Sequence, residues 1–251
     1  MIGLLLRLCA IVAAAGLLSA ASNGSDSITL EEIIRRNTEA MGGREAIERM
    51  RTVEISLHVS SPNFEVDGVY RATRPGRMRI DITAGGKHVF TETFDGEKAW
   101  QWQEGKEQKE AGPVPTAALR HGLELPGNLF GLHEMESRGH GVELHGREQI
   151  EGTNYYVLRV TLADGYQTSL YVDPQTWRIT RRRDFRALHP DIDPTPATIE
   201  VRKSDWRQTD GVWFPFARED VDVKTGKVLE TTTVKSIKVN PALDPSIITK
   251  L

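Results

Sequence analysis

The sequence predicts a mainly β (α+β) fold. We expect an antiparallel half-open barrel of about eleven strands, with N-terminal and mid-chain helices covering its concave face. Apolar and polar side chains alternate with period 2 along most of the chain after residue 52, which is typical of strands with one buried and one solvent-facing side. Asp-Gly pairs separate several of these runs, as they do in tight hairpins. Helix-forming sequence is found only before the first strand and in the middle of the chain.

The first 21 residues are expected to be a secretory signal peptide. The segment MIGLLLRLCAIVAAAGLLSAAS has one positive charge, a short apolar run and then small residues suited to cleavage. A membrane span needs about 20 apolar residues, so the alternative, an uncleaved anchor, fits less well. Residues 22–28 are interpreted as a polar linker and residues 29–251 as a single domain. Because the only cysteine, Cys9, lies in the leader, the mature chain would have no disulfide and no cysteine site.

Short helices are predicted at two places. Thr29 and Glu32 match the capping-box pattern, in which a hydroxyl and a carboxylate each satisfy a free backbone donor at a helix start. Gly42-Gly43 should end this helix in a left-handed conformation, and a second helix is expected at 44–50. The segment 113–136, in which glycine and proline interrupt helix-forming residues, predicts one or two more.

The clearest strands are VEISLHV (53–59), FEVDGVY (64–70) and the run 77–82. Further strands are expected within 88–103 and from 141 onward. So many consecutive hairpins should curl into a twisted sheet or an incomplete barrel. Its inner face needs a cover, and the two helical segments are the candidates. A curved sheet covered by helices would enclose a hydrophobic cavity.

Charge and motifs argue against nucleic-acid binding and catalysis. The formal net charge is −3, and acidic and basic residues are interspersed instead of forming a basic face. No GxSxG, P-loop or GxGxxG motif is present. Four histidines between positions 121 and 145 have spacings that match no metal signature. We therefore expect no nucleic acid, cofactor, metal or enzymatic activity, although carboxylates from distant strands could still converge.

The stretch TSLYVDPQTWRITRRRDF contains three consecutive arginines. Neighbouring side chains on a strand point to opposite faces, so Arg181 and Arg183 should lie on one face and Arg182, with Arg178, on the other. One interpretation is solvated faces with cross-strand ion pairs, and the other is contact with a phosphate or an anionic head group. Asp173-Pro174 predicts a type I turn before this strand.

Several segments, taken in order, resemble the LolA-like outer-membrane lipoprotein-sorting proteins of the periplasm. They are LEEIIRRNTEAMGGREAIERMRTVEISLHV, GVYRATRPGRMRIDI, TFDGEKAWQW, GREQIEGTNYYVLRVTLADG, LYVDPQTWRITR, DWRQTDGVWFPF and VKSIKVNPALDPSIIT. Each is a loose pattern, but together they span nearly the whole chain after the leader. The resemblance implies an unclosed antiparallel barrel with a helical lid and an apolar cavity for acyl chains, without cofactor or catalytic residues.

The function expected from this resemblance is that of a periplasmic carrier for lipoprotein acyl chains or other lipids. It would be monomeric and would exchange cargo with inner- or outer-membrane donor and acceptor proteins. A periplasmic sensory or regulatory binding module of the same fold is the alternative. The two tryptophans of KAWQWQ share a strand face, and they could line the cavity or pack as ordinary core. The residues expected to line the cavity are Leu57, Val66, Ile80, Phe90, Trp100, Trp102, Leu158, Val160 and Leu170.

Overall fold

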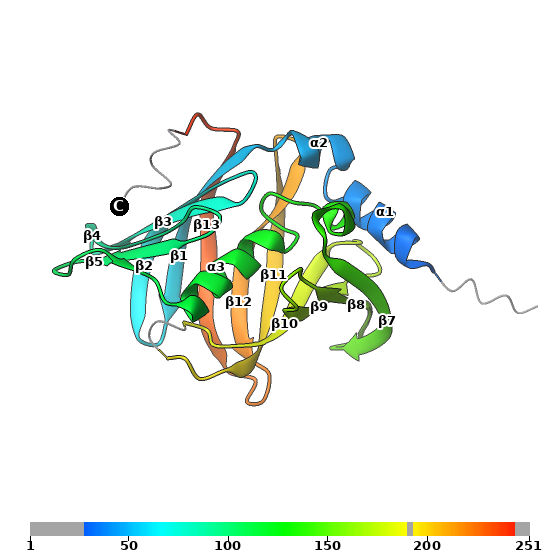
Figure 1. The fold of residues 1–251 in the computed structure, drawn as a ribbon. Helices are drawn as coiled ribbons and strands as arrows, with labels where there is room; N and C mark the ends of the chain where they lie inside the picture. Colours follow the sequence, from blue (N-terminus) through cyan, green and yellow to red (C-terminus); the bar gives the residue numbers. More distant parts are fainter. Residues whose placement is uncertain (1–27, 190–192, 244–251) are drawn as a thin grey trace, which may run out of the picture.

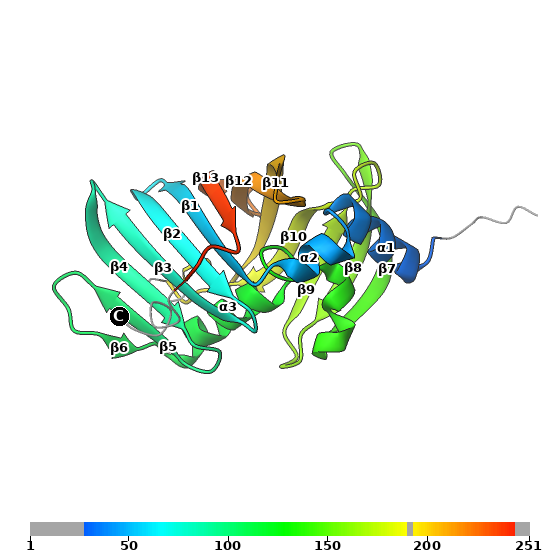
Figure 2. The ribbon, with the colours of Figure 1, turned by 90° about the horizontal axis from the view of Figure 1, so that it is seen from above.

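Thirteen antiparallel strands form one continuous sheet in the computed structural model, which describes residues 28–189 and 193–243 (Figure 1). The strand order is β6-β5-β4-β3-β2-β1-β13-β12-β11-β10-β9-β8-β7. The strands are β1 (Thr52–Ser61), β2 (Phe64–Thr73), β3 (Arg77–Ala84), β4 (Lys87–Phe94), β5 (Ala99–Gln103), β6 (Lys109–Glu110), β7 (Gly141–Ile150), β8 (Thr153–Thr161), β9 (Gln167–Val172), β10 (Ile179–Arg186), β11 (Ala197–Thr209), β12 (Val212–Asp222) and β13 (Val228–Val239). The sheet curls but does not close, because its two edge strands, β6 and β7, are not paired with each other (Figure 2).

Two groups of helices cover the concave side of this sheet. The first, α1 (Leu30–Ala40) and α2 (Arg44–Arg49), precedes β1. The second lies between β6 and β7 and comprises α3 (Pro113–Glu124) with two 3-10 turns, η1 (Leu132–Glu134) and η2 (Glu136–Arg138). Figure 2 shows α3 lying across the open side of the curved sheet, with α1 over the end formed by β7–β9.

The start of α1 forms only half of the expected capping box. The Thr29 hydroxyl accepts a hydrogen bond from the backbone N–H of Glu32 at 3.2 Å. The carboxylate of Glu32 does not make the reciprocal bond, because it pairs instead with Arg35 at 2.7 Å and Arg36 at 2.5 Å. The hydroxyl cap and the acidic first turn still favour the helix at this point.

The turn between α1 and α2 packs directly on the β11–β12 hairpin. Gly42 has φ of 120°, and a Cβ added there would collide with the backbone carbonyl of Gly211. The backbone N–H of Trp213 donates to the carbonyl of Met41 at 3.0 Å. The predicted glycine pair therefore ends the helix and also allows this close approach.

The apolar core has two large clusters along the sheet, and a small third one is formed by Tyr155, Val157 and Tyr171 of β8 and β9. The first joins α2, α3 and the loop after α3 to β1–β5 and β12, and the second joins α1 and η1 to β8–β10. Ile33 of α1 is fully buried against Leu158 and Leu170 in the second cluster. The helices are thus fixed to opposite halves of one curved sheet.

The mainly β, antiparallel, half-open architecture predicted from the sequence is confirmed, with thirteen strands instead of about eleven. The two-residue strand β6 escaped prediction because KEQKE is polar throughout and has no alternation. The expected signal peptide, Cys9 and all but the last residue of the linker 22–28 lie outside the described residues. The interpretation of 29–251 as a single domain stays a prediction.

Truncating Leu158 should lower the free energy of unfolding by about 2–5 kcal/mol, since Leu158→Ala leaves a void beneath α1 in a fully buried cluster. Urea denaturation followed by circular dichroism measures this. Phe185→Ala is the control, because that side chain on β10 is 69% exposed. It should change the free energy by no more than about 0.5 kcal/mol. Equal losses in the two variants would contradict the assignment of the inner face.

Candidate functional site

A cavity of about 870 Å³ lies between the concave face of the sheet and α3. Strands β1–β3 and β10–β13, the helix α3 and the loop after it all contribute side chains to its walls. Pockets that bury small molecules in proteins have volumes of about 300–1,000 Å³, so this cavity is large enough for a ligand.

One part of the cavity wall is apolar. Leu57, Tyr70 and Ile80 line it from three adjacent strands, and Leu119 and Phe130 line it from α3 and the following loop. Burial raises the pKa of Tyr70 to about 12, so its hydroxyl stays neutral under ordinary conditions. This region offers shape and apolar surface, and the charged side chain beside it, Glu92 of β4 opposite Ile80, accepts a hydrogen bond from Gln101 at 2.7 Å.

Among the residues expected from the sequence, Leu57 and Ile80 line this cavity. Val66 and Phe90 lie on the same face of the sheet by register, but neither belongs to the cavity lining. Contact of these residues with a ligand stays a prediction.

Trp100 and Trp102 lie on the opposite, outer face of the sheet. Gln101, between them, pairs with Glu92, a residue of the cavity wall. Strand alternation therefore turns both tryptophans away, and Trp102 stacks on His88 with ring centroids 4.7 Å apart. These two side chains pack on the outside of β5 and do not line the cavity.

Leu158, Val160 and Leu170 face the concave side but are buried by other parts of the chain. Their exposures are 0%, 0% and 2%, and they pack in a cluster that includes Ile33 of α1 and Met135. The N-terminal helix fills the space above this half of the sheet. In the structure these three leucine and valine side chains are core and not cavity wall.

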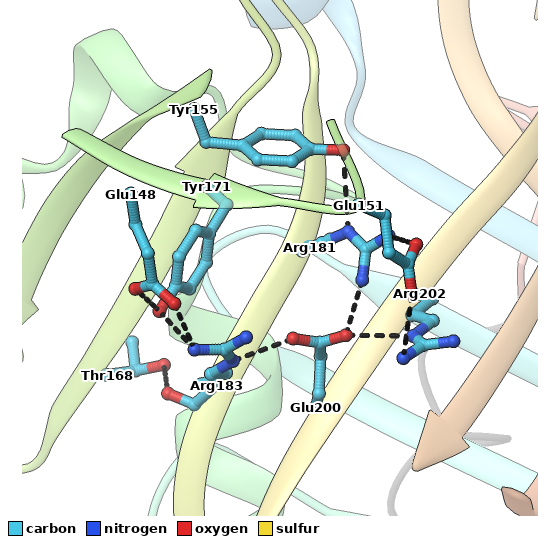
Figure 3. A network of polar contacts seen from close by, with 9 residues as sticks. All are labelled: Glu148, Glu151, Tyr155, Thr168, Tyr171, Arg181, Arg183, Glu200 and Arg202. Atoms are coloured by element: carbon cyan, nitrogen blue, oxygen red, sulfur yellow. Dashed lines mark hydrogen bonds and ion pairs between the residues drawn. The ribbon is translucent and has the colours of Figure 1, made fainter. Parts of the chain in front are cut away.

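Arg181 and Arg183 lie on the outer face, in the ion-pair network of Figure 3. Glu200 accepts from Arg181 at 2.6 Å and from Arg183 at 2.7 Å. The same arginines reach Glu151 at 2.5 Å and Glu148 at 2.6 Å. Burial opposes ionisation of Glu200, but its arginine partners outweigh burial and keep its pKa below the usual range. Of the two interpretations of the arginine stretch, cross-strand ion pairing is the one that describes Arg181 and Arg183.

Arg182 points the other way and lines the cavity. It shares the inner face with Val201 and Leu170, its partners on the two neighbouring strands. A register shift between Ile179 and Arg181 interrupts the alternation before it. Arg178 was expected on the same face as Arg182. Its guanidinium carbon lies over the ring of Trp213, 4.0 Å from the ring centroid.

Charged side chains gather on the inner face around Arg182. We call this group the inner polar cluster; its members are Arg182, Asp184 and Arg186 of β10, Lys203 of β11, Arg218 and Asp220 of β12, and Glu230 of β13. Of these residues, only Arg182 stands out from the sequence pattern. The pairing of Arg182, Val201 and Asp220 across three strands could not be read from alternation within single strands, because it depends on inter-strand register.

Two carboxylates of this cluster, those of Asp184 and Asp220, are held ionised by arginines. Asp220, fully buried, accepts two bonds at 2.8 Å from Arg218 and one at 2.8 Å from Arg186. Asp184 accepts from Arg182 at 2.7 Å. Burial alone would raise the pKa of Asp184 and of Asp220, but the adjacent guanidinium groups dominate and lower both below the usual range.

A polar link connects α3 with the inner polar cluster. His121 of α3 lies 2.7 Å from a carboxylate oxygen of Asp164 in the β8–β9 turn. Its ring stacks on Tyr166, with centroids 3.9 Å apart, and the Tyr166 hydroxyl donates to Asp184 at 3.0 Å. The end of α3 is therefore positioned by polar contacts at the cavity, whereas α1 is held by apolar packing.

The loop after α3 is fixed at the other side of the cavity. Arg74 donates to Glu134 at 2.6 Å and to the carbonyl of Leu129 at 2.5 Å, and its guanidinium lies 4.5 Å from the centroid of Phe130. Phe130 is itself part of the cavity wall. This buried ion pair thus sets the position of one wall.

Within residues 28–189 and 193–243, no group of three or more His, Cys, Asp or Glu side chains is placed to hold a metal ion. Over the same ranges, no helix is both long and apolar enough to cross a membrane.

Solved structures with the same fold include proteins of three bacteria. A LolA superfamily protein of Nitrosomonas europaea is 15% identical, with a TM-score of 0.56 over 89% of this chain and 99% of that one. A DUF1329 family protein of Desulfovibrio piger is 12% identical, with a TM-score of 0.57 over 87% and 96%. A domain from Vibrio parahaemolyticus, whose name refers to outer membrane lipoprotein sorting, is 11% identical, with a TM-score of 0.54 over 86% and 94%. No protein-family model and no curated protein sequence matches the chain. The fold is LolA-like, as the sequence resemblance predicted.

The inner polar cluster should make stability depend on acid pH. Because the pKa values of Asp184 and Asp220 are lower in the folded than in the unfolded chain, their contribution is complete above about pH 4 and is lost as the pH falls through the folded values. Asp220→Asn should flatten this acid limb and lower the free energy of unfolding at neutral pH by about 3–5 kcal/mol. Urea denaturation over a pH series measures both effects.

The control is Asp205→Asn, which removes a carboxylate that is 46% exposed in its ion pair with Arg207. It should change the free energy of unfolding by about 0–1 kcal/mol. An Asp220→Asn variant with the acid limb of the parent protein would show that this cluster is not responsible.

Proposed function

We propose that this protein is a periplasmic, non-catalytic carrier that binds the acyl chain of a lipoprotein or another lipid in the cavity beneath α3. The observation that carries the proposal is a cavity of about 870 Å³ with an apolar wall, built between a half-open barrel and a helix. The likeness of the fold to a LolA superfamily protein and to a domain named for lipoprotein sorting supports it. The proposed export of the protein to the periplasm is inferred from its leader sequence.

The physical demands of such a carrier match the cavity. Each methylene group transferred from water into an apolar site contributes about 0.8 kcal/mol, so an acyl tail needs only apolar walls of the right shape. Leu57, Ile80 and Phe130 supply such walls. The helix α3 makes few close contacts with the sheet, mostly with β4 and β5, so it can be displaced at a lower cost than a helix packed along its whole length. We propose that ligand enters as α3 moves away.

Native mass spectrometry of protein purified from periplasm should detect a co-purified lipid or lipopeptide. Ile80→Trp should reduce this occupancy and weaken binding of a fluorescent acyl probe by about tenfold, because the indole fills volume that the chain would occupy. Val69→Trp, on the outer face of the adjacent strand β2, is the matched control and should bind as the parent does. Transfer of labelled lipid between two vesicle populations tests the carrier role directly.

A protein that is consistently empty and does not respond to acyl probes would refute the proposal. Binding without any acceleration of vesicle-to-vesicle transfer would replace the carrier by a module that senses lipid. Equal loss of binding in Ile80→Trp and Val69→Trp would place the ligand elsewhere.

A further inference from the structure

Lys203 occupies a particular position in the cavity wall. It lies on β11 directly opposite Arg218 of β12, and Val201, two residues earlier, pairs with Arg182 of β10. A Cβ added at Gly127 would lie 3.8 Å from the Lys203 ammonium, which places this ammonium beneath the loop that follows α3. Lys203 and Gly127 both line the cavity. The ammonium group is therefore at the junction of the sheet, the loop and the open space.

Lys203 differs from the other cations of the inner polar cluster. Arg182 pairs with Asp184 at 2.7 Å, and Arg186 and Arg218 each reach Asp220 at 2.8 Å. Glu230, the remaining carboxylate of the cluster, lies 2.8 Å from His189. Among the described residues, Lys203 has no hydrogen bond and no ion pair. Four cations against three carboxylates leave one positive charge in excess.

The surroundings of Lys203 oppose its charge. Burial, followed by repulsion from Arg182 and Arg218, lowers its pKa to about 7, and Asp184 offsets only part of this. An unpaired ammonium in such a place destabilises the folded protein, and replacement by an apolar side chain would relieve the penalty. An anion bound beside it would have the same effect.

The apolar and cationic parts belong to one cavity. Leu57, Tyr70 and Ile80 line it on the β1–β3 side, while Arg182, Lys203 and Arg218 line it on the β10–β12 side. A ligand that fills it from side to side meets hydrocarbon-like surface at one end and a single uncompensated positive charge at the other.

We propose that Lys203 binds the monoanionic head group of an acyl-chain amphiphile whose tail occupies the apolar side of the cavity. The inference deepens the proposed lipid-binding function and rests on it. A singly charged carboxylate or phosphodiester matches the excess charge, whereas a neutral lipid leaves Lys203 unpaired and a dianionic phosphomonoester adds an unmatched negative charge. The arginines then serve mainly to hold the ionised carboxylates, and Lys203 is the cation left for the ligand.

Isothermal titration calorimetry with ligands of one tail length tests this inference. The probes are palmitate, palmitoyl-lysophosphatidylglycerol and the neutral monopalmitoylglycerol. The parent protein should bind at least one anionic probe about tenfold or more tightly than the neutral one, as expected for a charge-assisted contact in a cavity. Lys203→Met should abolish this preference while keeping affinity for the neutral probe, and Lys203→Arg should retain it. The two anionic probes distinguish a carboxylate from a phosphodiester.

Lys235→Met is the matched control, because Lys235 lies on β13, is 52% exposed and pairs with Asp67 outside the cavity. It should keep the preference of the parent. Equal binding of anionic and neutral probes by the parent, or an unchanged preference in Lys203→Met, would overturn the role of Lys203 and leave the proposed lipid-binding function intact. If no acyl probe binds at all, the proposed function fails, and this inference fails with it.

Binding should also draw a proton onto the protein. An anion beside Lys203 raises its pKa from about 7, so at about pH 8 binding of lysophosphatidylglycerol is accompanied by proton uptake. The other charged and titratable groups around this site are Arg182, Asp184 and Arg186 of β10, Arg218 and Asp220 of β12, Glu230 with His189, and His121 with Asp164 and Tyr166.

The measurement compares binding enthalpies in buffers of different ionisation enthalpy. Uptake approaching one proton is expected for the parent, and none for Lys203→Met. Uptake of the same size in both proteins, or no uptake in the parent, would contradict the assignment of this ammonium as the ligand's partner.

Discussion

The constraint on which the rest of the structure depends is that the thirteen-stranded sheet does not close. Strands β6 and β7 are its two edges, so its concave face cannot be filled by strands of the opposite side, as in a small closed barrel. Segments outside the sheet must cover that face. The chain uses two covers of different character, and the difference between them creates the cavity.

The two covers differ in how they are held. Ile33 of α1 is fully buried against Leu158 and Leu170, so one half of the concave face becomes ordinary core. The helix α3 lies over the other half and leaves about 870 Å³ beneath it. Polar contacts fix its surroundings: His121 with Asp164 at one end, and Arg74 with Glu134 in the loop that follows. The His121–Asp164 pair is the more exposed of the two and the easier to break, whereas the Arg74–Glu134 pair, only 14% and 11% exposed, would cost more to open.

Much of the fold could be predicted from the sequence, because side-chain alternation is a local property. It located the strands, and it divided Arg181 and Arg183 from Arg182. It could not decide which face is concave, so Trp100 and Trp102 were expected inside although they lie outside. Nor could it show that α1 fills the space above Leu158. Those outcomes depend on register and on which helix covers which half, and both are set by contacts between residues far apart in the chain.

The charges on the inner face of β10–β12 are the feature that packing alone does not explain. Buried ion pairs rarely stabilise a fold more than apolar side chains of similar size would, because desolvation offsets most of their attraction. A chain that needed only a core at this point could therefore use leucine and valine, as it does at Leu158 and Val201. Asp184 and Asp220 instead hold three arginines in place, and two of these, Arg182 and Arg218, repel the ammonium of Lys203. This repulsion adds to the effect of burial and lowers the pKa of Lys203. The arrangement costs stability at one end of the cavity, and in the proposed lipid-binding function it provides there a cation that would favour a charged lipid over a neutral one.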